Sequence, residues 1–139
     1  MIEVNSKIKG KLLHKVYRAS ELTENRTELV AADQFIQCAY LKMDKGKTFR
    51  PHQHIWKDPN FDRVIAQESW VVIRGSVKVF FYDIDGDLLE THILQAGDSS
   101  FTLEGGHTYE ILEDNTLVYE YKTGPYEGQE NDKVFLDEL

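Results

Sequence analysis

The chain has little of several features that mark other classes of protein. Its one cysteine, Cys38, excludes an intrachain disulfide, and the apolar stretch around it favours a buried, inert thiol. No apolar run approaches the ~20 residues that a membrane-spanning helix needs. Residues 1–11 are polar and lack the apolar segment of a signal peptide. We therefore expect a cytoplasmic protein that makes no use of a membrane.

Basic residues are also scarce relative to acidic ones. Lysine and arginine total 16 against 24 aspartate and glutamate residues, which gives a formal net charge of −8. An acidic surface repels phosphate backbones, and no basic stripe offsets it, so a nucleic-acid partner is not expected. With 139 residues, the chain is long enough for one domain and one core but too short for two.

Long helical patterns are missing as well, and short strand patterns take their place. The candidate strands are short, rich in Val, Ile, Phe, Tyr and Thr, and bounded by turn residues such as Asp85-Gly86-Asp87. These strands are 34–43, 48–54, 67–74, 76–83, 88–94, 98–103, 107–112 and 116–122. Many short strands with tight turns predict an all-β, antiparallel sandwich or barrel.

Residues 1–33 are polar and only weakly patterned. They are predicted to form an N-terminal arm or edge segment in front of a barrel that spans residues 34–139. Three forms are open for this arm: an edge strand, a short helix around residues 20–28, or an extension that docks on another subunit.

Three short stretches carry residues suited to chemistry. His52 and His54 are two positions apart, so on a strand both imidazoles project from the same face. Glu68 opens an otherwise apolar strand, where a buried carboxylate needs a partner such as a cation. His107 follows two glycines at the start of another strand, and glycines let the backbone pass close to an occupied site.

Together these stretches resemble the two sequence motifs of the cupin superfamily. The first motif matches a run that begins with Gly46, continues after five residues with His52-Gln53-His54, and ends with Glu68, six residues and Gly75. Gly97-Asp98 and His107 follow the start and the end of the second. The resemblance covers roughly residues 40–122, with residues 55–67 as an insertion between His54 and Glu68. It implies a single-domain jelly-roll barrel, the double-stranded β-helix of the cupins.

The resemblance also implies one bound metal ion. The four ligands of the family carry over onto His52, His54, Glu68 and His107. Three imidazoles and one carboxylate suit a divalent Fe, Mn, Ni, Co, Cu or Zn ion and leave positions open for water or substrate. The alternative is a barrel in which the histidines act as acid–base groups without a metal, since imidazole titrates near ~6.5.

The candidates for the remaining roles lie on the same strands and at the end of the last one. A base is sought in Tyr109 or Glu110, and contacts to a substrate in Trp70, Tyr109, Lys122 and Tyr126. The glycines before His107 and the turn after Lys122 loosely resemble small bacterial cupins found with enzymes of surface-sugar biosynthesis. We expect a small-molecule ligand and, as is common in cupins, a homodimer.

These features leave three hypotheses for the function. The first is a metal-dependent enzyme, of the isomerase, epimerase or dioxygenase type, that acts on a small polar molecule such as a sugar or sugar nucleotide. The second is a non-catalytic cupin that binds or senses a ligand. The third is a metal-free sugar-nucleotide isomerase. Whether the chain is an enzyme stays open at this point.

Overall fold

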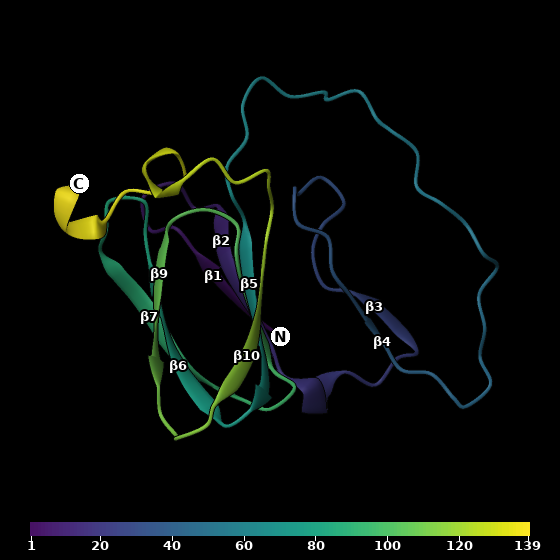
Figure 1. The fold of residues 1–139 in the computed structure, drawn as a ribbon. Coiled ribbons are helices and arrows are strands. Elements are labelled where there is room, and N and C mark those ends of the chain that lie inside the picture. The colour runs from purple at the N-terminus through teal and green to yellow at the C-terminus, as the bar shows by residue number, and fades with distance from the viewer.

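The computed structural model describes residues 1–139 and consists of antiparallel sheets, which confirms the all-β prediction (Figure 1). The larger sheet has the order β1 (Ile2–Asn5), β2 (Leu12–Tyr17), β8 (Ser99–Thr102), β5 (Glu68–Arg74) and β10 (Leu117–Lys122). The smaller sheet has the order β7 (Leu88–Gln95), β6 (Ser76–Tyr82) and β9 (Gly106–Ile111). A separate hairpin pairs β3 (Arg26–Glu28) with β4 (Ala39–Leu41). Three 3-10 turns complete the chain: η1 (Ala19–Glu21), η2 (Gln129–Asn131) and η3 (Leu136–Glu138).

The main core fills the space between the two large sheets. Val4, Val16 and Val72 from the five-stranded sheet meet aliphatic and aromatic side chains of β6 and β7, and every member of the cluster is at most 2% exposed. Alternation along each strand sends these residues to one face, as a half-buried sheet requires. The core therefore defines an inner face on each sheet, and the functional side chains described below share it.

The outer face of the five-stranded sheet carries a second core. Tyr17, Phe101 and Leu103 pack there against Leu29, Val30 and Ile36, all of them buried. The segment that leads to β4 therefore covers part of this face. A sheet with apolar side chains on both faces needs a cover on each, and residues 29–36 supply the second one.

Residues 1–33 contribute directly to the main sheet. β1 pairs with β2, and β2 pairs with β8, so β1 is the edge strand among the three forms expected for this segment. Val4, Leu13 and Val16 are buried. The apolar alternation of β2 is short and interrupted by His14 and Lys15, which explains its weak signal in the sequence.

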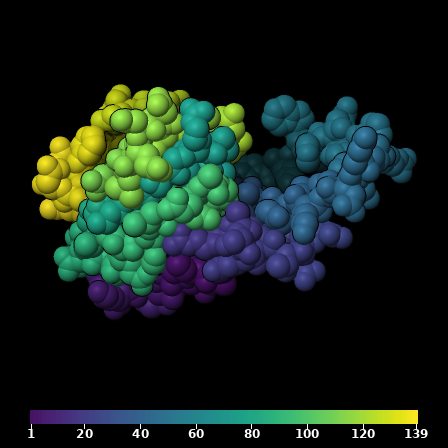
Figure 2. All heavy atoms as spheres, turned by 90° about the horizontal axis from the view of Figure 1, so that it is seen from below, coloured from purple at the N-terminus to yellow at the C-terminus, as the bar shows by residue number.

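Residues 42–67 depart most from the sequence prediction. The strand expected at 48–54 does not form, and the one expected at 34–43 is reduced to β4. No backbone–backbone hydrogen bond involves residues 48–66. The segment projects from the sandwich and exposes Phe49, Ile55 and Trp56 (Figures 1 and 2). A strand needs a neighbour for its ladder, and nothing pairs with this one.

The end strands of the two sheets, β1, β7, β9 and β10, each keep a free edge. β9 pairs only with β6, and β10 pairs only with β5, so each ends its sheet. The sheets thus form an open antiparallel sandwich, and closure into a jelly roll is not seen.

No helix of the chain is long and apolar enough to cross a membrane.

Candidate functional site

Polar side chains form a row across the inner face of the five-stranded sheet. The strand register places His14 beside Thr102, Thr102 beside Glu68, and Glu68 beside Lys122. Directly paired residues on one face of a sheet are neighbours within reach of each other. Four polar groups from β2, β8, β5 and β10 therefore line one end of an otherwise apolar interior.

His107 reaches this row from the opposite sheet. Its Nε2 lies 3.1 Å from Glu68 Oε1, and the two side chains are 22% and 11% exposed. Gly105, with φ +83°, allows the approach, because a Cβ there would lie 2.6 Å from the Tyr82 carbonyl oxygen. The glycines noted before His107 thus have a steric reason. This partly buried histidine–carboxylate pair is the centre of the candidate site.

The environment of Glu68 keeps its carboxylate ionised. Burial raises the pKa of Glu68, but the hydrogen bond and charge of His107, with contributions from Glu120 and Lys122, bring the pKa below its ordinary value. In its neutral form, a His107 ring that donates from Nε2 to this carboxylate carries no proton on Nδ1. That Nδ1 atom is buried and has no hydrogen-bond partner. The pair therefore presents an oriented imidazole with a free acceptor nitrogen.

Tyr109 and Trp70 lie next to the pair. Tyr109 shares the inner face of β9 with His107, and its hydroxyl lies 3.1 Å from Ser100 Oγ. Burial raises the pKa of Tyr109, and the nearby Glu68 and Glu120 carboxylates add to this rise. Tyr109 therefore stays protonated at neutral pH and offers a hydrogen bond rather than a base.

Lys122 and Tyr126, both predicted substrate contacts, are brought together at the end of β10. Lys122 Nζ lies 3.2 Å from Asp132 Oδ2 and 4.5 Å from the centre of the Tyr126 ring. Burial lowers the pKa of Lys122, but the bond to Asp132 and the surrounding carboxylates raise it overall. The ammonium group thus stays charged beside the polar row.

His14 is a member of the row that the sequence analysis did not select. It is fully buried, stacks on Phe81 with ring centres 4.4 Å apart, and contacts Thr102 Oγ1 and the Tyr82 carbonyl. Burial lowers the pKa of His14 to about 4, so the ring is neutral. Its contact with Thr102 holds one neighbour in the row. The alternation of β2, which places His14 on the same face as Val16, is the only signal that could have indicated it.

The other predicted residues lie away from this centre. His52 and His54 sit in the projecting segment, both exposed, with ring centres 5.4 Å apart. Glu110 is exposed on the face of β9 opposite to His107 and Tyr109. The structure therefore brings Glu68 and His107 together, and it brings none of these three to them.

The predicted metal can be tested against this arrangement. Glu68 and His107 offer one oxygen and one nitrogen donor side by side. No group of three or more His, Cys, Asp or Glu side chains that could hold a metal ion is present. Catalytic metal sites usually take three protein ligands. The residues as arranged do not fit a resident ion.

A cavity of about 450 Å³ opens beside the charged end of the row. Its wall includes Asp132, the partner of Lys122, together with residues 64–66 and 123–125. The volume lies in the range of small-molecule sites in proteins.

No protein-family model matches the chain, and comparisons with curated proteins and with solved structures gave no match. The fold and the site define an all-β antiparallel sandwich with a partly buried histidine–carboxylate pair at one end.

Proposed function

We propose that this chain is a cupin-like enzyme that moves a proton on a small polar molecule, such as a sugar or sugar nucleotide. The contact between His107 Nε2 and Glu68 Oε1 carries the proposal. A carboxylate that orients an imidazole is a recurring arrangement for general acid–base catalysis. The only other histidine–carboxylate contact joins His92 to Glu90, and that carboxylate is 46% exposed.

Each neighbour has a part in this chemistry. Glu68 fixes the proton on Nε2, and His107 takes or gives a proton through Nδ1, the buried atom that has no hydrogen-bond partner. The Tyr109 hydroxyl supplies a hydrogen bond to an oxygen of the substrate. Lys122, whose partner Asp132 lines the neighbouring cavity, offers a positive charge to an anionic group such as a phosphate. An isomerisation or epimerisation next to a carbonyl uses this set of groups.

Proton exchange with solvent gives a direct test. The protein is incubated in D2O with a panel of keto sugars, sugar nucleotides and keto acids, and deuterium incorporation is followed by NMR. We expect incorporation with one class, and a loss of at least ~100-fold in Glu68→Gln or His107→Asn, the usual weight of a general base. His92→Asn, at the other pair, is the matched control and retains the rate. Saturable binding without exchange supports the ligand-binding alternative. The absence of both binding and exchange would contradict the proposal.

A divalent metal is the second candidate, because Glu68 and His107 already place an oxygen and a nitrogen donor at 3.1 Å from each other. Residues 48–66 make no backbone–backbone hydrogen bond that would hold His52 and His54 away from this pair. We propose that a divalent metal ion bound at Glu68 and His107 recruits both histidines through this segment. Calorimetric titration with Mn²⁺, Ni²⁺ or Zn²⁺ tests it: His52→Ala and His54→Ala weaken binding, whereas His92→Ala does not. Equal affinity in all variants contradicts the four-ligand site.

A further inference from the structure

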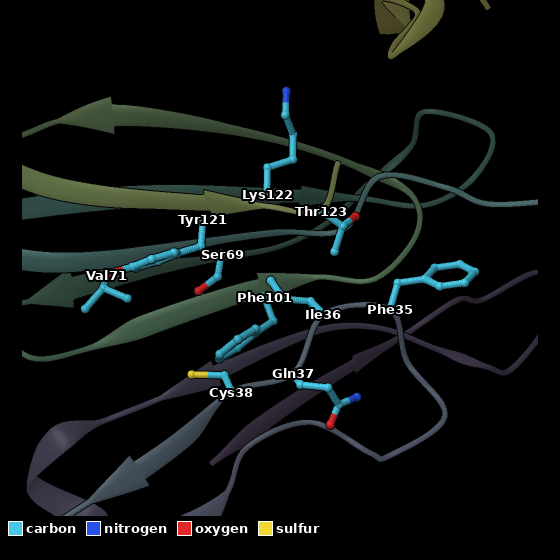
Figure 3. A pocket seen from close by; sticks show the side chains of 10 residues that line it. All are labelled: Phe35, Ile36, Gln37, Cys38, Ser69, Val71, Phe101, Tyr121, Lys122 and Thr123. Carbon is cyan, nitrogen blue, oxygen red and sulfur yellow. The ribbon is translucent and has the colours of Figure 1, made fainter. Parts of the chain in front are cut away.

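A second cavity, of about 340 Å³, lies on the other face of the five-stranded sheet (Figure 3). Strand alternation separates it from the proton-transfer site, since Glu68 and Trp70 face inward, whereas Ser69 and Val71 face outward. The strand register sets Phe101, Ser69 and Tyr121 side by side as its floor. Residues 35–38 form its opposite wall.

Most of the cavity lining is apolar, and Ser69 is the lining residue whose polar group is buried and unpaired. Ser69 is 2% exposed, and its hydroxyl is buried without any hydrogen-bond partner. Figure 3 shows the Ser69 side chain directed from its strand toward Phe101, across the cavity from residues 35–38. Buried hydroxyls are nearly always paired, so an unpaired one aimed into a cavity marks a place for a ligand atom.

No charged group is directed into the same space. The Lys122 side chain points away from the cavity in Figure 3 and binds Asp132. The Gln37 amide is already engaged, since its Nε2 donates to the Ala31 and Gln34 carbonyls. A charged ligand would therefore lose its hydration without gaining a counterion.

We propose that this cavity binds a neutral small molecule with a hydrophobic ring and one hydroxyl or carbonyl group. The ring packs against Ile36, Val71 and Phe101, and the polar group pairs with Ser69 Oγ, which both donates and accepts. An apolar cavity of about 150 Å³ holds one benzene molecule. The larger volume here accommodates one or two rings, and its half-open side leaves room for a substituent.

NMR titration of the uniformly ¹⁵N-labelled protein tests the site, with p-cresol and toluene as a pair of probes that differ by one hydroxyl. We expect saturable shifts at residues 35–38, 69–71, 101 and 121, and tighter binding of p-cresol. Ser69→Ala weakens p-cresol by about five-fold, the value of one ordinary hydrogen bond, and leaves toluene unchanged. Ser76→Ala, a buried serine outside the cavity, is the matched control.

A second readout uses the Cys38 thiol, which lines the same cavity. Its reaction with a thiol reagent slows as p-cresol saturates the wild-type protein, so this readout does not depend on a variant. The proposal is overturned by any of three results: no saturation up to the solubility limit, shifts centred on His107 and Trp70, or an equal loss of both probes in Ser69→Ala. Shifts at His107 and Trp70 would leave the proton-transfer proposal standing, since that site lies on the other face.

Discussion

Trp70 and Tyr109 stack face to face across the two sheets, with ring centres 3.7 Å apart and planes inclined by 6°. Trp70 comes from β5 and Tyr109 from β9, and the Trp70 indole N–H donates to Glu120 Oε1. The stack sits directly beyond the Glu68–His107 pair along both strands. It closes the inner side of the candidate site and ties together two strands that share no ladder.

This stack is expected to contribute to stability. Trp70→Ala removes the ring contact and part of the core boundary, and lowers the free energy of unfolding by ~2–4 kcal/mol. Tyr109→Phe keeps the stack, loses the bond to Ser100 and costs ~1 kcal/mol. Urea denaturation measures both. Equal losses in the two variants would contradict the geometry described.

His14 predicts a dependence of stability on pH. Its pKa is about 4 in the fold against 6.5 in the unfolded chain, so the unfolded state binds more protons between these values. The stabilisation is complete above pH 6.5 and is lost as the pH falls toward 4, by about 3 kcal/mol at ~1.4 kcal/mol per pH unit. His14→Gln flattens the profile between pH 4 and 6.5, and His92→Gln does not. An unchanged profile in His14→Gln would refute the assignment.

Asp83 and Asp85, two acidic residues of one turn, are expected to differ in their contribution to stability. Asp83 is 2% exposed and accepts hydrogen bonds from Ser6 Oγ and from the Lys7 and Ile84 amides. Asp83→Ala leaves these donors unpaired and costs ~2–4 kcal/mol. Asp85→Ala, in the exposed part of the same turn, costs under ~1 kcal/mol. Thermal unfolding of the two variants checks this, and similar melting temperatures would count against it.

The segment 42–67 predicts where a protease cuts first. Its exposed aromatic residues Phe49, Trp56 and Phe61 lie in backbone without ladder hydrogen bonds. Brief chymotrypsin treatment of the folded protein is expected to cleave at these sites while the sandwich stays intact. Mass spectrometry of the fragments identifies the cuts. First cleavage within β5 or β6 would show that the segment is better packed than described.

The free edges of β9 and β10 bear on the expected homodimer. β10 exposes Tyr119 and Tyr121 at 55% and 60%, and an unpaired edge with exposed aromatic residues favours association. We expect a dimer in sedimentation velocity and a shift toward monomer in Tyr119→Lys. Thr91→Lys, on the exposed part of β7, is the control. A concentration-independent monomer in the wild type would exclude this interface.

The sequence predicts well those strands whose neighbours are close along the chain. β5 and β6 join at Gly75, and β6 and β7 join at Gly86, so alternation and turn residues specify them locally. β2 is harder to predict, because its place is set by a ladder with β8 about 85 residues further on. Residues 48–54 have the local propensity for a strand, but no neighbouring strand pairs with them, so the strand does not form.

The site residues also divide into those that the sequence predicts and those that only three-dimensional contacts define. Glu68 and His107 were predicted from motif spacing, and each sits on a strand whose partners fix its direction. His14, Asp132 and Ser69 carried no such signal, because their importance depends on contacts made in three dimensions. A buried unpaired hydroxyl, for example, is defined only once its surroundings exist.

The state of the His107 ring tests the account most directly. Long-range ¹H–¹⁵N NMR of the wild-type protein, at a pH where this ring is neutral, reports which nitrogen carries the proton. The contact with Glu68 predicts a single Nε2–H tautomer, which gives way to a mixture in Glu68→Gln. A wild-type ring protonated on Nδ1, or averaged between both nitrogens, would contradict the pairing on which the proposed proton transfer depends.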